Sequence, residues 1–153
     1  MWQNTTPVPN AVFDRWLREL KCAELKILLV IIRQTLGWKD NKSGTGRKKI
    51  DWIAGSQLRE KTGSSPRAIC SATEVLVRKN LIEVLGENGA FLDSPEKRKG
   101  KMKLFYPIAP TVNSPVDNPG KSDPATAKIA EDLRKKVIEV SASFAYNKIN
   151  PTK

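Results

Sequence analysis

The stretch from residue 56 to residue 82, SQLREKTGSSPRAICSATEVLVRKNLI, constrains the fold more than any other part of the chain. It holds two short helical patterns separated by a turn of only three residues, GSS. Gly63 is suited to end the first helix, Ser65 is a suitable N-cap for the second, and Pro66 fits its first position. Two helices joined by so tight a turn indicate a helix-turn-helix.

The residues on either side of this motif carry further helix and strand patterns, which together predict a complete fold. Helices are expected over 11–20 and about 23–36, and the second is apolar on nearly every side, which is typical of a central helix. Alternation predicts a strand over 49–54, and β-like runs predict two more over 81–87 and 101–108, with a hairpin-type Asn-Gly turn between them. The expected fold class is mainly α with a small β-wing, a winged helix-turn-helix.

A change in composition after residue 108 divides the chain into three parts. We expect a winged-helix DNA-binding domain over 6–108, a proline-rich linker over 109–124, and an amphipathic helix over 125–149. A flexible linker favours a role for this helix in self-association or partner binding rather than in the core. Its apolar stripe consists of Ile129, Leu133, Val137, Val140 and Phe144.

The net charge of +11 points to a polyanionic partner, either nucleic acid or an acidic membrane, because the cations are clustered. The alternative is a basic protein whose charge serves only solubility. The most apolar run, residues 27–32, is too short to cross a bilayer, and the N-terminus does not resemble a signal peptide. We therefore expect a cytoplasmic protein without a membrane partner.

The chain contains no histidine, which removes the commonest general acid–base group and the usual zinc ligands. Its two cysteines lack metal-binding spacing, and SGTGRKK (43–49) lacks the ending of a phosphate loop. Tyr106 and Tyr146 are interpreted as packing residues. The sequence therefore predicts no enzymatic activity, no metal and no cofactor.

The second helix of the motif has two unlike faces. Ile69, Ala72, Thr73 and Leu76 form a stripe that is expected to pack on the central helix, while small and basic residues occupy the front and the other face. Small side chains let a helix approach the floor of the major groove, where hydroxyls and arginine reach base edges. The predicted DNA-binding residues of this recognition helix are Ser64, Ser65, Arg67, Ala68, Ser71 and Arg78.

Two other basic segments are expected to contact phosphates, although each is also compatible with a solubilising loop. The wing supplies Lys97, Arg98, Lys99, Lys101 and Lys103, and the loop after the central helix supplies Arg47, Lys48 and Lys49. Three tryptophans adjoin apolar runs and are expected to anchor the core rather than to stack on bases. They are Trp16, Trp38 and Trp52.

The stretch TPVPNAVFDRWLRELKCAELKILLVIIRQTLGW (6–38), together with GSQLREKTGSSPRAICSATEVLVRKNLI (55–82), resembles the N-terminal domain of phage replication protein O, the origin-binding initiator of lambdoid phages. The resemblance covers about residues 6–86. It implies a dimeric winged-helix domain that binds repeated origin sites in double-stranded DNA, and a C-terminal segment that recruits the replicative helicase or its loader. It also places Ser65, Arg67, Ala68 and Ser71 on the family's recognition helix.

Three functions remain open at this point. The first is initiation of replication of a phage or mobile element at repeated origin sites by a homodimer. A transcriptional repressor would have the same fold, which does not distinguish the two roles. A protein–protein adaptor, whose winged helix does not bind DNA, belongs to another class.

Overall fold

Helix α2, Cys22–Gln34, is the central element of the computed structural model, which describes residues 5–40, 46–101, 103–109, 112, 131–132, 134–135 and 137–139. Ile27, Leu28, Ile31 and Ile32 on this helix are completely buried, and α2 packs against both α3 and α4. The expected central helix is thus confirmed. One apolar side chain of the helix, Leu29, remains 38% exposed.

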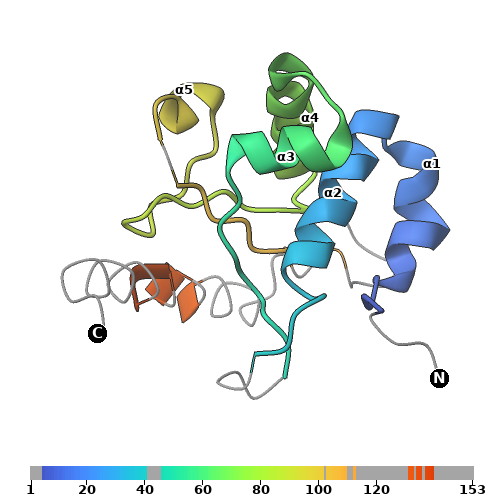
Figure 1. The fold of residues 1–153 in the computed structure, drawn as a ribbon, viewed down its shortest axis with the longest axis horizontal. Coiled ribbons are helices and arrows are strands. Elements are labelled where there is room, and N and C mark those ends of the chain that lie inside the picture. The colour runs from blue at the N-terminus through green and yellow to red at the C-terminus, as the bar shows by residue number, and fades with distance from the viewer. Residues whose placement is uncertain are drawn as a thin grey trace.

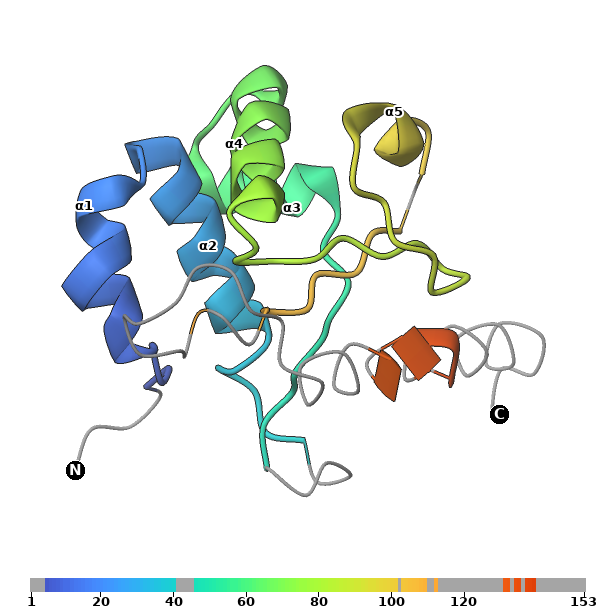
Figure 2. The same cartoon turned by 180° about the vertical axis from the view of Figure 1, so that it is seen from behind.

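The helical segment before α2 begins with a π-helical turn, η1 (Val12–Trp16), and continues as α1 (Leu17–Glu19). Its buried side chains are Val12 and Trp16, followed by Leu20 at the end of the segment. These are the three apolar positions that the helical spacing predicts. Figures 1 and 2 show this segment beside α2.

The two helices of the predicted motif are α3 (Gly55–Thr62) and α4 (Pro66–Arg78). Gly63 ends α3 in the left-handed conformation with φ of 66°, and its N–H donates to the Arg59 carbonyl at 2.8 Å. The Ser65 hydroxyl accepts a hydrogen bond from the Ala68 N–H at 3.3 Å, so Ser65 is the N-cap of α4. The local signals for this turn were therefore sufficient to predict it.

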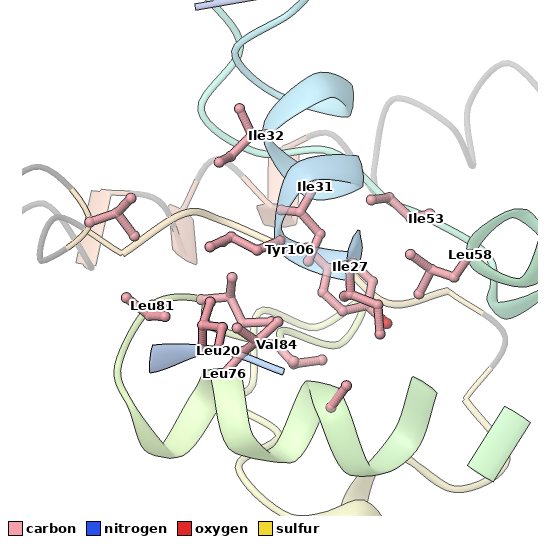
Figure 3. Close-up of a cluster of buried hydrophobic side chains, with 14 of the residues drawn as sticks. Leu20, Ile27, Ile31, Ile32, Ile53, Leu58, Leu76, Leu81, Val84 and Tyr106 are labelled. Carbon is pink, nitrogen blue, oxygen red and sulfur yellow. The ribbon is translucent and has the colours of Figure 1, made fainter. Parts of the chain in front are cut away.

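The main core lies between these helices and the extended segments that follow α4. Figure 3 shows side chains from α2, α3 and α4 meeting Leu81, Val84 and Tyr106. Tyr106 is almost completely buried, as expected for a packing residue, and burial raises its pKa to about 12. A second, smaller cluster consists of Ile50, Leu85, Phe105 and Val137.

Within the described residues, the expected strands over 49–54, 81–87 and 101–108 do not form. The three segments instead meet at isolated antiparallel bridges, Trp52 with Phe105, Leu85 with Phe105, and Ile82 with Ile108. Leu85 and Phe105 exchange two N–H···O bonds of 2.9 Å, but the next pairing uses Pro107, which accepts from the Glu83 N–H and has no N–H to return. The ladder of backbone hydrogen bonds between these two segments is therefore interrupted at Pro107.

The wing also differs from the expected pair of strands. Gly86 and Gly89 close a turn, with a bridge between Leu85 and Phe91, so the predicted turn at Asn88-Gly89 is present. The basic connection that follows, which was expected to form the wing tip, contains a short helix, α5 (Pro95–Arg98). Pro95 at the first helical turn explains this, because its fixed φ suits that position.

Part of the expected C-terminal helix lies within the described residues, and those at 131–132, 134–135 and 137–139 are helical. Val137 is completely buried in the second cluster, and the Arg134 carbonyl lies 3.1 Å from the position that a Cβ on Gly89 would occupy. Ile129, Leu133, Val140 and Phe144 lie outside the described residues, as does nearly all of the predicted linker.

Candidate nucleic-acid interface

Helix α4 presents one face to the core and the other to solvent. Ile69, Ala72, Thr73 and Leu76 are buried on the face that packs against α2, as the sequence predicts. The opposite face is a single exposed stripe, because its members recur at helical spacing. It consists of Arg67, Cys70, Ser71, Glu74 and Arg78.

At the N-terminal end of α4, four of the predicted DNA-binding residues have different surroundings. Arg67 is exposed, Ala68 is half-buried, and Ser65 is engaged as the helix cap. The Ser64 N–H donates to the Thr62 hydroxyl at 3.2 Å, which fixes the turn before the helix. Arg67 is therefore the long cationic side chain that this end of α4 presents to solvent.

The cations of the expected wing divide into paired and exposed groups. Lys97 forms an ion pair of 2.8 Å with Asp93, and its hydrogen bond lowers the pKa of that carboxyl. Lys103 lies 3.2 Å from a Glu87 carboxylate oxygen. Lys99 and Lys101, at the end of α5 and just after it, are exposed. Figures 1 and 2 place α5 at the same edge of the molecule as the start of α4.

Arg98 is separated from this group by its burial. It is only 9% exposed, and its Nε donates to the Ser94 carbonyl at 3.0 Å, while Nη2 lies 3.5 Å from the Asp93 carbonyl oxygen. Through these contacts the Arg98 side chain, at the end of α5, binds the backbone that directly precedes the helix. Arg98 is therefore engaged within α5, unlike the exposed Lys99 and Lys101.

The predicted loop patch lies elsewhere. The segment that follows α2 extends to the end of the molecule opposite the start of α4, in both views (Figures 1 and 2). Arg47 donates to the Leu36 carbonyl at 3.2 Å and Lys48 forms an ion pair of 3.1 Å with Asp51, whereas Lys49 is exposed. The structure thus brings α4 and α5 to one edge but does not bring this loop to them.

Trp38 is a surface residue that the sequence did not identify. It is 51% exposed, so the expectation that it anchors the core is wrong, whereas Trp16 is buried. The Arg33 guanidinium lies over the Trp38 ring at 5.2 Å from its centroid. The polar residues that follow it, Lys39 and Asp40, were a local signal that the apolar run had already ended.

Among the residues that the structure describes, no three histidine, cysteine, aspartate or glutamate side chains gather as a metal site. No helix in the same residues is long and apolar enough to cross a membrane. The arrangement defines a mainly helical protein with a basic helix end and a basic loop exposed at one edge.

A comparison with protein families identifies what kind of helical protein this is. The family model for bacteriophage replication protein O matches residues 4–91, which is more than half of the chain. The chain belongs to the bacteriophage replication protein O family, as the resemblance over 6–86 predicted. This family functions in phage DNA replication. Neither the curated proteins nor the solved structures gave a match.

Proposed function

We propose that this chain is a replication initiator that binds specific sites in the duplex DNA of a phage origin through α4. In this proposal α3, the turn and α4 act as a helix-turn-helix, and α5 with its flanking bridged segments takes the place of the wing. The observation that carries the proposal is the pair of unlike faces of α4, one buried on α2 and one exposed from Arg67 to Arg78. Recognition helices contact bases with their N-terminal residues, which favours Arg67.

Lys99 and Lys101 are proposed to contact the phosphate backbone beside the groove that α4 enters. They are exposed, and α5 lies at the same edge as the start of α4 (Figure 1). Lys97 and Lys103 would first have to leave Asp93 and Glu87, so their contribution is expected to be smaller. Phosphate contacts orient the protein but carry no sequence information, so specificity is assigned to α4 alone.

The family favours replication over the alternative of a transcriptional repressor. By the same reasoning we propose binding as a homodimer to repeated origin sites, and recruitment of the replicative helicase or its loader by the segment that follows the linker. Both parts rest on the family and not on contacts in the described residues. Sedimentation of the protein on duplexes that carry one or two selected sites tests the dimer.

The decisive experiment for DNA recognition is the substitution Arg67→Ala. A duplex is first selected from a random pool with the wild-type protein, and affinities for the selected and an unselected duplex are then measured at one fixed salt concentration. A bidentate contact of arginine to guanine contributes about 1–3 kcal/mol of discrimination. Arg67→Ala should therefore lower the selected-to-random affinity ratio by roughly fivefold to more than a hundredfold.

Arg18→Ala is the matched control, since Arg18 is an exposed arginine on α1, outside the proposed interface. It should leave the ratio unchanged, and Arg78→Ala at the far end of α4 should weaken both duplexes by similar small factors. If Arg67→Ala leaves the selected-to-random affinity ratio unchanged, α4 is not the element that recognises bases. If the wild-type protein selects no duplex at all, the adaptor hypothesis takes the place of this proposal.

A further inference from the structure

Trp38 lies at the surface shortly after the end of α2, and hydrogen bonds hold its backbone on both sides. Its backbone N–H donates to the Thr35 carbonyl at 3.1 Å, and its carbonyl accepts from the Lys48 N–H at 3.1 Å. The backbone is thus fixed from both sides while the residue remains 51% exposed. A large aromatic ring in this state loses little conformational entropy when a ligand covers it.

Gly37 brings Arg33 and the ring together. The Arg33 Nη1 lies 3.4 Å from the Gly37 carbonyl oxygen, and a Cβ on Gly37 would lie 2.6 Å from Nη1 and still closer to the Arg33 carbonyl oxygen. A side chain at position 37 would therefore push Arg33 away. With glycine there, the guanidinium remains over the ring and supplies a cation–π contact.

The surroundings of the ring are basic. Lys39 and Lys49 are exposed, and Lys39 pairs through its backbone with Arg47. An apolar protein partner would have to cover these cations, whereas a nucleic acid places phosphates beside each base that it stacks. Charge complementarity therefore selects a polyanion with exposed planar groups as the occupant of this surface.

We propose that Trp38 and Arg33 form a stacking platform for an unpaired base of single-stranded DNA, with Lys39 and Lys49 contacting the adjacent phosphates. Bases within a duplex are already stacked on their neighbours, so an exposed tryptophan face accepts a base only where the strands are separated. The platform spans the C-terminal end of α2 and the segment after it, which extends to the end of the molecule opposite the start of α4 (Figures 1 and 2). One protein molecule would then hold duplex DNA at α4 and a separated strand at Trp38.

The test compares Trp38→Ala with the wild-type protein on two probes, a labelled oligothymidylate of about 20 nucleotides and a random duplex of the same length. Loss of one aromatic–base stack should weaken binding to oligothymidylate by roughly fivefold to a hundredfold. Affinity for the duplex should remain within a factor of two. Trp38→Phe keeps an aromatic face and should recover most of the single-strand affinity.

Phe13→Ala is the matched control, because Phe13 is 56% exposed on η1, outside the proposed platform, and its removal should change neither affinity. Equal losses on both probes, or no loss on oligothymidylate, would overturn the proposal. Arg67→Ala should leave oligothymidylate binding intact, so failure of duplex recognition by α4 and failure of the platform give different results. Circular dichroism of Trp38→Ala confirms that the fold is retained.

Discussion

The helical half of the molecule and the half built from bridged segments are stabilised in different ways. In the first, α2 packs against α3 and α4; α2 and α4 contribute apolar residues at helical spacing, and α3 contributes Leu58. In the second, the segments around Trp52, Leu85 and Phe105 meet at isolated bridges over a small cluster. One member of that cluster, Val137, comes from the C-terminal helix. The main core is built mostly from the helices and is completed by nearby segments such as Leu81, Val84 and Tyr106, whereas the smaller cluster of the bridged half depends on the C-terminal helix.

The largest expected effect comes from the centre of the helical half. Leu76 is completely buried on α4, where the helix faces α2. Leu76→Ala should lower the free energy of unfolding by about 2–5 kcal/mol, because the lost transfer energy is added to the cost of a cavity. Urea unfolding followed by circular dichroism measures the change.

Ser71→Ala is the control on the same helix, since Ser71 is exposed and its removal should change the free energy of unfolding by less than about 0.5 kcal/mol. A Leu76→Ala variant that lost under about 1 kcal/mol would show that α4 is not part of the main core. The contrast between the two halves would then have no basis.

The sequence predicted the helical half because the signals there are local. Gly63, Ser65 and Pro66 define the turn before α4 within four residues, and the apolar spacing then gives the buried face. The same type of signal, a serine followed by proline, also precedes α5 at Ser94-Pro95.

The bridged half was harder to predict because its pairing depends on distant residues. Alternating patterns indicated strands, but the position of Pro107 opposite Glu83 is fixed only by the fold, and it interrupts the ladder. The exposure of Trp38 likewise depends on Arg33 and Gly37 holding the ring at the surface. Which cations are engaged in ion pairs, such as Lys97 with Asp93, is also a tertiary property.

A smaller effect is expected from the contact that joins the C-terminal helix to the bridged half. Val137→Ala should lower the free energy of unfolding by about 1–3 kcal/mol, because Val137 is completely buried against Ile50, Leu85 and Phe105. Amide hydrogen exchange should show the loss of protection at Leu85 and Phe105 before it appears in α2.

Ile138→Ala is the matched control, since Ile138 is the next residue on the same helix and is 52% exposed. If Val137→Ala and Ile138→Ala are equally neutral, the bridged half is stable without the C-terminal helix. That outcome would leave the helix free for the partner or self-association role that its apolar stripe predicts.

The smallest effect concerns the charge of Glu83 in the bridged half. Burial raises the pKa of this carboxyl above its ordinary value of 4.5, and the positive charge of Arg134 on the C-terminal helix opposes the rise. Within the described residues, Glu83 Oε2 is buried and makes no hydrogen bond. The ionised carboxylate is thus less favourable in the folded protein than in the unfolded chain.

Because the folded protein binds this proton more tightly than the unfolded chain, the contribution of Glu83 to stability is most favourable below pH 4.5 and is lost as pH rises through the raised pKa. Glu83→Gln removes this dependence, so the variant should be slightly more stable than the wild-type protein at pH 7, and the advantage should disappear near pH 4. Urea midpoints of both proteins between pH 4 and pH 8 measure the difference, with Glu74→Gln on the exposed face of α4 as the control for loss of one negative charge. A wild-type protein that is the more stable of the two at pH 7 would mean that the attraction to Arg134 outweighs burial. The C-terminal helix would then hold the bridged half by charge as well as by Val137.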